Sequence, residues 1–269
     1  MKMNNVLKMM IAGVMMSGFA VAAENPVATY TPEQEARIGE VAKNYLLSHP
    51  EVLVDVSQKL QAQQQEKQQQ AMISSIIQNK TALLNHKGTP SYGPADAKVT
   101  VVEFFDYQCI YCARLAPELE KVIKANPGVR FIFKEFPIFG QRWPASLTAA
   151  KTGLQIWQQK GSDAYLHYHN AIYATGHNEG KLNEHDIRTA AEAVKFDAGN
   201  VTDVRGILGD IYGLAQQLGI SGTPALIILP AKGASIDNVT VIPGLATAGA
   251  LQVAIDKAAV SGKNNKSER

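Results

Sequence analysis

Cysteine is nearly absent from this chain, whose 269 residues contain two, Cys109 and Cys112. The sequence has no second cysteine pair, so it lacks the ligand set of a closed four-thiolate zinc site. It also lacks the repeated cysteines with which small exported domains replace a hydrophobic core. A chain of this length buries a sizeable core without such bridges. The two cysteines therefore need an explanation other than stabilising the fold.

The N-terminus lacks an apolar run long enough to cross a bilayer. Met9 to Val21 is apolar apart from Ser17, follows Lys2 and Lys8, and is followed by small residues suited to cleavage. This pattern predicts a secretory signal peptide over residues 1–23, and an uncleaved N-terminal anchor is the alternative. No cysteine follows the cleavage site, which argues against a lipoprotein anchor.

The exported chain lacks an excess of either charge. Lys2 and Lys8 supply two of the 26 basic residues, so 24 basic residues face 24 acidic residues after cleavage. A neutral balance gives no electrostatic reason to expect a nucleic-acid partner. Export also places the protein where disulfides persist.

The region from residue 31 to residue 86 has a helical pattern. Thr31-Pro32-Glu33-Gln34 is a capping box with proline at the first helical position. Apolar stripes at both ends flank Gln61 to Gln70, which is rich in glutamine. Helices this few cannot form a core of their own, so their stripes dock on the rest of the chain or on another copy. We expect residues 24–87 to be an oligomerisation region that forms a homodimer or homotrimer through residues 31–86.

The remaining sequence predicts an α/β domain over residues 88–262, before a disordered tail at 263–269. Gly88 to Gly93 has the composition of a linker. Four apolar or β-branched runs predict strands: Val99–Phe105, Val129–Phe136, Ala225–Leu229 and Val239–Ile242. Helical patterns lie at residues 109–125, 145–159, 163–174, 184–194, 201–218 and about 247–259. A parallel crossover needs about a dozen residues, yet the second and third strands are much farther apart. We therefore expect a thioredoxin fold with an inserted helical domain at about residues 140–219.

The cysteines themselves favour redox chemistry. A disulfide that closes so short a loop would restrict the unfolded chain by only about 2 kcal/mol in the loop-entropy model. Cys109 is expected where a strand has ended and a helix begins, so unpaired backbone N–H groups would stabilise its thiolate. Cys109 is then the exchanging nucleophile and Cys112 the resolving thiol. Copper(I) capture by the two sulfurs is a lesser alternative. His167 and His169 lie two apart on a predicted helix and point to different faces, and His169 is interpreted as a packing residue.

Two further features stand where such chemistry would need them. Glu103 is charged within an apolar strand and lies on the face that leads to Cys109. Buried there, its pKa would rise and it could exchange protons with Cys112. The alternative is a carboxylate at the sheet margin paired with a lysine. Thr223-Pro224 precedes the third strand, and a cis proline there would sit in a tight turn beside a strand edge that can pair with a substrate backbone.

Together, "VVEFFDYQCIYC", "SGTPALIIL" and Pro117 resemble thioredoxin-fold disulfide oxidoreductases of the DsbA type. The resemblance covers roughly residues 94–260. It implies that Cys109 and Cys112 are the redox-active pair, that Pro224 is cis and faces them, and that Glu103 is the buried acid. The N-terminal region is similar to those of suppressor-of-copper-sensitivity C proteins and of DsbA-like surface antigens of intracellular bacteria.

The dipeptide between the cysteines departs from the DsbA pattern. Ile110-Tyr111 replaces the usual Pro-His, whose histidine helps to stabilise the thiolate. Tyr111 is similar to the tyrosine of the Gly-Tyr pair in the dimeric isomerase DsbC. The threonine before Pro224 also resembles the isomerases. The resemblance thus implies a less strongly oxidising pair and an isomerase as well as an oxidase capacity.

The sequence therefore predicts a periplasmic thiol:disulfide oxidoreductase and isomerase that needs no cofactor or metal. Its expected partners are unfolded or misoxidised exported proteins and a membrane redox partner of the DsbB or DsbD type. Association with the inner or outer membrane stays open. The alternatives are a monomeric DsbA-like oxidase and a copper-binding protein that keeps a thioredoxin scaffold.

Overall fold

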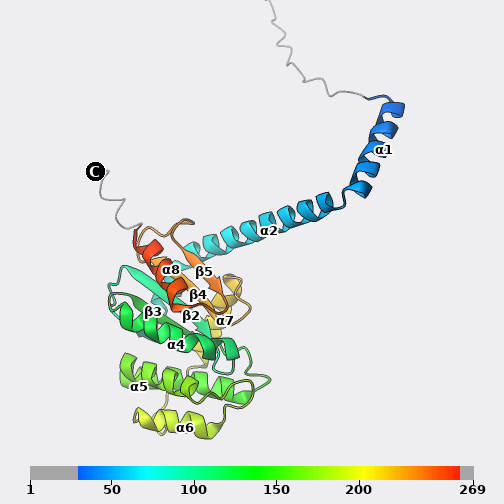
Figure 1. The fold of residues 1–269 in the computed structure, drawn as a ribbon. Coiled ribbons are helices and arrows are strands. Elements are labelled where there is room, and N and C mark those ends of the chain that lie inside the picture. Colours follow the sequence, from blue (N-terminus) through cyan, green and yellow to red (C-terminus); the bar gives the residue numbers. More distant parts are fainter. Residues whose placement is uncertain (1–29, 261–269) are drawn as a thin grey trace, which may run out of the picture. The chain divides into compact units, whose positions relative to one another are not determined.

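The computed structural model describes residues 30–260 (Figure 1). The expected signal peptide, residues 1–23, and the expected tail, residues 263–269, lie outside the described residues. The chain divides into two compact units, one ending at Lys59 and one beginning at Leu60. Within residues 30–260, no helix has both the length and the apolar character that a membrane span requires.

The first unit contains α1, Pro32–Ser48, and the start of α2, Glu51–Gln78. The predicted capping box begins α1, because Thr31 Oγ1 accepts from the N–H of Gln34 and the Gln34 side chain accepts from the N–H of Thr31. This arrangement satisfies two N–H groups that lack partners within the helix.

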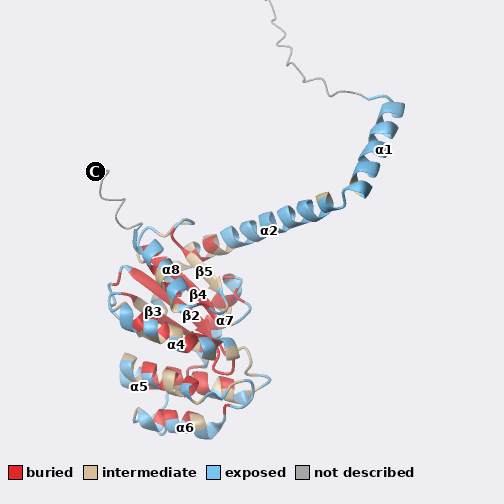
Figure 2. Cartoon of the chain, viewed as in Figure 1, coloured by how far each residue is buried: buried red, intermediate tan, exposed pale blue. Residues whose placement is uncertain are grey.

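The apolar residues of α1 are exposed. Ile38, Val41 and Tyr45 retain 51%, 63% and 53% of their accessible surface, respectively. None of the residues of α1, all of which the structure describes, is buried (Figure 2). The apolar stripe that the sequence predicted is therefore present, and its side chains are exposed.

The second unit is built around a five-stranded sheet of order β1-β3-β2-β4-β5. Its strands are β1 Ser91–Tyr92, β2 Val99–Phe105, β3 Arg130–Glu135, β4 Ala225–Pro230 and β5 Thr240–Pro243. Its other helices are α3 Lys80–Asn85, α4 Ile110–Ala125, α5 Pro144–Ala174, α6 Glu184–Ala193, α7 Arg205–Gln217 and α8 Ala248–Val260. Only β2 and β3 pair in parallel; the other neighbours are antiparallel. The four predicted strands and the α/β class are confirmed.

Both faces of the sheet are covered, since all seven residues of β2 are buried. Val101 and Phe105 pack in one core with residues of α4, α5 and α8. Val102 and Phe104 point to the opposite face and pack in a second core with residues of α7. This is the alternation that a strand buried on both sides requires.

The second core also receives side chains from the end of α2 and from α3. Ile73 is 4% exposed, and Ile76 and Leu83 are fully buried, beside residues of β2, β4 and α7. The second unit therefore needs residues that lie before Lys87, where we expected the oligomerisation region to end.

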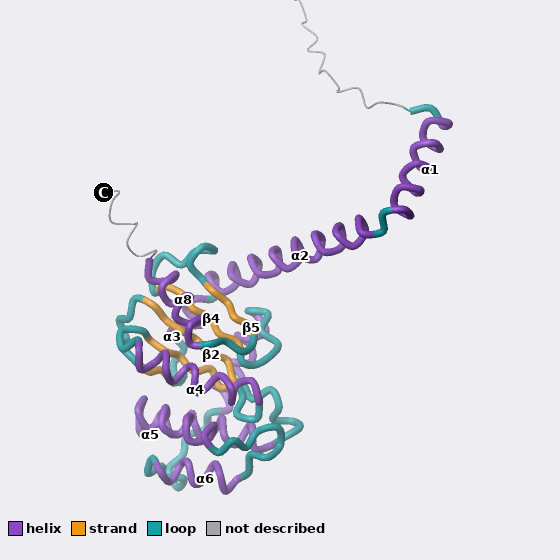
Figure 3. Tube along the Cα trace, viewed as in Figure 1, coloured by secondary structure: helices purple, strands orange, loops and turns teal. Residues whose placement is uncertain are grey.

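The segment between β3 and β4 is helical, as expected. The two helices predicted at residues 145–159 and 163–174 are confirmed: α5, labelled as one element from residue 144 to residue 174, is broken at Gly161, whose φ of 79° and ψ of −166° are not helical. Helices α5 and α6 lie side by side beyond α4 (Figure 3). Helix α5 of this insertion packs in the first core, on the sheet face on which Glu103 lies, whereas α7 packs on the opposite face.

Strand β1 lies within the segment that was predicted to be a linker. Ser91 and Tyr92 pair with Ile132 and Phe131 of β3. Gly93 has a φ of 92°, and a Cβ there would lie 2.3 Å from the carbonyl oxygen of Val129. Glycine thus ends the strand where two backbones approach closely. A strand of two residues is too short to be recognised in the sequence from an alternation of apolar and polar residues.

Candidate active site

Cys109 occupies the N-cap of α4, directly after the turn that follows β2. Its φ and ψ are −80° and 119°, and its side chain makes no capping hydrogen bond to the helix. Its N–H donates to the carbonyl oxygen of Asp106 at 3.0 Å. The sulfur is thus fixed near the unpaired N–H groups and the positive end of the helix dipole.

Asp106 fixes this turn through its side chain. Its buried carboxylate accepts from the N–H of Gln108 and the N–H of Phe139, each at 2.8 Å, and from the Ser146 hydroxyl. These bonds tie the turn to the loop after β3 and to the start of α5. We did not single out Asp106 from the sequence, although an acidic residue between a strand and a helix N-terminus is a common signal for a fixed turn.

Gln108 attaches the same turn to the loop between α5 and α6. Its side-chain oxygen accepts from the N–H of Gly180 at 2.8 Å, and its backbone oxygen accepts from the N–H of Glu179 at 2.9 Å. Glu179 and Gly180 have positive φ values of 52° and 92°. No local sequence pattern identifies this contact, because its partners lie far apart in the chain.

The thiol of Cys109 is strongly acidified. Its pKa falls from the ordinary 9.0 to about 6, chiefly because the Cys112 thiol donates a hydrogen bond to the thiolate. Burial opposes the shift, while Thr223 and the N–H groups of Cys112 and Tyr111 add to it. With a pKa of about 6, roughly 90% of the thiol is ionised at pH 7.

Cys112 lies one turn into α4 and is fully buried. Both cysteines are free thiols in this structure. Burial raises the pKa of Cys112 well above its ordinary value, and the thiolate of Cys109 and the carboxylate of Glu103 raise it further. Cys112 therefore keeps its proton until a base removes it.

The segment before β4 approaches Cys109. The Thr223–Pro224 peptide bond is cis, as predicted. The sulfur of Cys109 lies 3.3 Å from the backbone oxygen of Thr223, and the N–H of Gly244 donates to the backbone oxygen of Pro224 at 2.8 Å. The structure thus brings together Cys109, Cys112, Thr223 and Pro224 from two distant stretches of sequence.

Glu103 lies in the middle of β2 and is 2% exposed. Burial, and then the charge of Cys109, raise its pKa from 4.5 to about 8. The alternative of a marginal carboxylate paired with a lysine does not hold, because β2 is a central strand and no ion pair of Glu103 occurs within residues 30–260. Its position beneath the cysteines suits a group that exchanges protons with Cys112.

Alkylation of Cys109 is expected to follow its low pKa. The rate with iodoacetamide should rise with pH and reach half its plateau near pH 6, because only the thiolate reacts. In the Cys112→Ala variant the midpoint should move to higher pH, since the largest stabilising hydrogen bond is lost. A wild-type midpoint near pH 9 would contradict this account of the site.

Within the described part of the chain, no three His, Cys, Asp or Glu side chains group in the way a metal ion requires. His169, expected to be a packing residue, is indeed buried, and its ring packs against Phe105, Phe133 and Tyr173. Its imidazole does not have both nitrogens satisfied, however, because Nε2 has no partner among the described residues.

Two family models and several solved structures match this chain. The thioredoxin family model matches residues 85–240, and the model of the copper resistance protein ScsC N-terminal domain matches residues 34–67. The crystal structure of BcfH from Salmonella enterica Typhimurium is 46% identical, covers 84% of this chain and 96% of its own, and gives a TM-score of 0.73. ScsC of Proteus mirabilis, in a transitional conformation, is 26% identical over 87% of this chain and 99% of its own, with a TM-score of 0.59.

A match to a curated protein covers a smaller part of its relative. The Na(+)/H(+) antiporter NhaA 1 of Salinispora arenicola is 27% identical over 143 residues, which are 51% of this chain. The chain spans 21% of the length of that relative.

Proposed function

This chain belongs to the thioredoxin family, and we propose that it is a thiol:disulfide oxidoreductase that forms and reshuffles disulfides in exported proteins. The observation that carries the proposal is the pairing of an acidified Cys109 thiol with a buried, protonated Cys112 at a helix N-terminus. A low pKa makes Cys109 the attacking or leaving sulfur, whereas Cys112 acts only after it loses a proton.

The exchange would proceed in two steps. The Cys109 thiolate attacks one sulfur of a substrate disulfide, forming a mixed disulfide and releasing the other substrate sulfur as a thiolate. Cys112 gives its proton to the Glu103 carboxylate and attacks Cys109, so the Cys109–Cys112 disulfide forms and the substrate leaves reduced. Run in reverse, the same steps oxidise a substrate dithiol, and no cofactor takes part.

The cis-proline segment would hold the substrate during both steps. The backbone oxygen of Thr223 lies 3.3 Å from the Cys109 sulfur. A substrate backbone that pairs beside Thr223 and Pro224 would therefore place its own sulfur at Cys109. Unfolded or misoxidised proteins suit such a site, because main-chain pairing makes few demands on side chains.

We further propose that the protein works in the periplasm as a homodimer or homotrimer assembled through residues 31–86. The exposed stripe of Ile38, Val41 and Tyr45 supports this, because a second copy would remove those side chains from water. Several redox sites around a shared space would favour isomerisation of a bound client. A membrane partner of the DsbB or DsbD type would reset the cysteine pair.

Disruption of the α1 stripe tests the oligomer. The double variant Ile38→Glu, Val41→Glu should be monomeric by solution mass and should lose the ability to reactivate scrambled ribonuclease, because charge in the stripe prevents its burial. Oxidation of a reduced peptide should persist, since the redox site is untouched. Glu40→Ala, an exposed change on the same helix, is the control and should retain both activities.

The outcomes separate the candidates. If the wild type is a monomer and never reshuffles disulfides but oxidises the peptide, it is a monomeric DsbA-like oxidase. A truncation that starts at Leu60 should keep oxidase activity, whereas one that starts at Lys87 removes Ile73, Ile76 and Leu83 from the core. Losing even one such side chain costs about 2–5 kcal/mol, so the protein that starts at Lys87 should not fold stably.

A further inference from the structure

Lys134 is a buried residue of a charged type to which the exchange steps assign no role. It lies in β3 and is 0% exposed. Phe104 of β2 is its partner in the parallel pairing, so its side chain lies on the sheet face of the second core. Glu103 and Glu135 occupy the alternate positions of these strands and point to the opposite face. Lys134 is therefore separate from the redox site.

The amine of Lys134 is covered by residues 86–92 (the edge segment), which end in β1 at the edge of the sheet. Ser91 pairs with Ile132 in the antiparallel ladder of β1 and β3, and the same register continued by two residues places Thr89 opposite Lys134. Nζ of Lys134 accordingly donates to Oγ1 of Thr89 at 3.3 Å. Thr89 is 6% exposed, so neither group has ready access to water.

A chain of hydrogen bonds continues from Thr89 to the surface. Nδ1 of His86 lies 3.0 Å from Thr89 Oγ1, and Nε2 of His86 lies 3.0 Å from a carboxylate oxygen of Asp210 on α7. A carboxylate only accepts, so Nε2 carries a hydrogen, and in the neutral imidazole Nδ1 then accepts from the Thr89 hydroxyl. The oxygen of Thr89 is thereby left to accept from Lys134. Asp210, whose side chain is 68% exposed, ends the chain at the surface.

No carboxylate neutralises Lys134. Within residues 30–260 it forms no ion pair, and Thr89 is its one hydrogen-bond partner. The titratable groups on the elements around it are Lys80, His86 and Lys87 in or beside α3, Arg130 of β3, and Arg205, Asp210 and Tyr212 of α7. Burial, and then the charge of Arg130, lower the pKa of Lys134 from 10.5 to about 7. The amine therefore gains or loses its proton near neutral pH.

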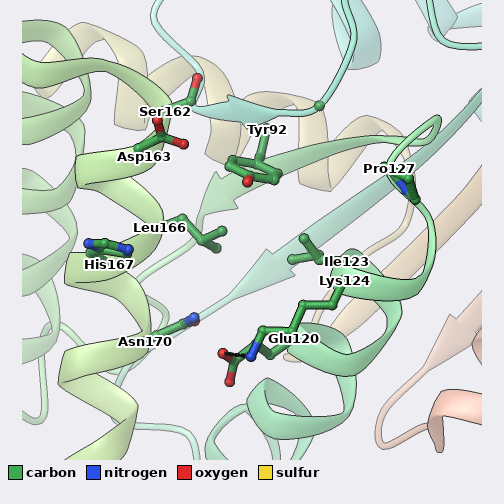
Figure 4. A pocket seen from close by; sticks show the side chains of 11 residues that line it. Tyr92, Glu120, Ile123, Lys124, Pro127, Ser162, Asp163, Leu166, His167 and Asn170 are labelled. Carbon is green, nitrogen blue, oxygen red and sulfur yellow. Dashed lines mark hydrogen bonds and ion pairs between the residues drawn. The ribbon is translucent and has the colours of Figure 1, made fainter.

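The strand β1 attaches the edge segment only weakly. It has two residues, and beside it the N–H of Phe133 donates to the backbone oxygen of Pro90 at 2.9 Å. On the other face of the sheet, the half-buried Tyr92 lines a cavity of about 600 Å³ together with Ile123 of α4 and Leu166 of α5 (Figure 4). A side chain that borders a cavity lacks part of its packing contacts. Local opening of the edge segment therefore breaks few interactions.

We propose that Lys134 and Thr89 form an acid-sensitive latch, in which protonation of the buried amine loosens the edge segment from β3. In the closed latch the ammonium lies among apolar side chains with one hydroxyl as its partner, which costs free energy. Release of Thr89 lets water reach the ammonium. The bond from His86 to Asp210 keeps the start of the segment on α7, because Nε2 donates in both the neutral and the charged imidazole. An open latch leaves the edge of β3, including the N–H of Phe133, without its partner.

Hydrogen exchange at the N–H of Phe133 tests the latch in the reduced wild-type protein. Lys134 binds protons with the ordinary pKa of 10.5 when the latch is open and with a pKa of about 7 when it is closed. Linkage then makes the opening equilibrium about tenfold greater at pH 6 than at pH 8, after correction for the pH dependence of the chemical exchange step. Urea at low concentration should not change it, because a local opening exposes little surface.

Three variants identify the groups responsible. In Lys134→Met, which keeps a long side chain without its charge, the difference between pH 6 and pH 8 should disappear. Thr89→Val should raise the opening equilibrium more at pH 6 than at pH 8, since a charged donor loses more with its acceptor than a neutral one. Lys87→Met, an exposed change in the same segment, is the control and should retain the tenfold difference.

Four results would overturn the inference. One is equal opening of the wild type at pH 6 and pH 8, and another is a tenfold difference that persists in Lys134→Met. A third is exchange of the Phe133 N–H only through unfolding that urea promotes. The fourth is a titration midpoint of Lys134 near pH 10 by nuclear magnetic resonance with ¹³C-labelled lysine. If Lys134→Met does not fold, an equal effect of Thr89→Val at both pH values decides against the latch. No measurement requires turnover, so the latch is tested separately from the proposed exchange activity.

Discussion

Cys109→Ser is expected to reduce both peptide oxidation and disulfide reshuffling to the uncatalysed background. Serine is close to cysteine in size, so the N-cap geometry and the bonds of Asp106 should persist. A hydroxyl, however, neither ionises near neutral pH nor forms a disulfide, so no mixed intermediate can arise. Oxidation of a reduced peptide and reactivation of scrambled ribonuclease would measure the loss.

Cys112→Ser is the matched variant, because it retains the attacking sulfur and removes the resolving one. It should accumulate a mixed disulfide with a cysteine-containing peptide, visible by mass spectrometry and released by dithiothreitol. The reversed pattern, with adducts only in Cys109→Ser, would exchange the roles of the two cysteines. Equal activity of Cys109→Ser and the wild type would exclude redox chemistry at this site.

The sequence predicted the central strands well because the physical signal there is local. Val99–Phe105 is apolar throughout except for Glu103 and Thr100, and it forms β2 with these bounds. Helix α6 begins at a capping box formed by Asn183 and Asp186 and likewise agrees with its pattern. Such elements carry their own start signals and periodicity.

Features that depend on tertiary contacts were not predictable in this way. Ile73 and Ile76 are three residues apart, as are Ile38 and Val41 of α1, yet Ile73 and Ile76 are buried in the second core whereas Ile38 is exposed. Spacing reveals that a helix has an apolar face, but it does not reveal what covers that face. The break in α5 at Gly161, by contrast, was predictable as the gap between two helical patterns, because glycine readily adopts the positive φ found there.

The same division applies to the site. Cys109, Cys112, Glu103 and Thr223-Pro224 could be selected because their residue types and positions in the elements carry chemical meaning. Glu135 could not, because its burial depends on distant residues: its side-chain oxygen would lie 2.6 Å from a Cβ at Gly153. The space that glycine leaves on α5 is what admits this second carboxyl to the core.

Glu103→Gln is expected to slow the Cys112-dependent step by about 10²- to 10⁴-fold, the usual contribution of a positioned acid or base. Glutamine fills the same space but cannot take a proton. Resolution of a preformed mixed disulfide at Cys109 would show the delay, whereas alkylation of Cys109 would change little. Glu120→Gln, a change at a partly exposed residue of α4 that removes an ion pair with Lys124, should behave as the wild type.

The same substitution should also change how stability depends on pH. The pKa of Glu103 is about 8 in the folded protein and ordinarily 4.5, so the folded state binds more protons than the unfolded state between these values. Its stability therefore falls as pH rises through this window. Since one pKa unit corresponds to about 1.4 kcal/mol, urea unfolding of the reduced wild type should reveal a loss of a few kcal/mol between pH 5 and pH 8 that Glu103→Gln lacks. Parallel pH profiles for the two proteins would mean that Glu103 titrates normally, and a normal carboxyl could not take the proton of so weak an acid as buried Cys112.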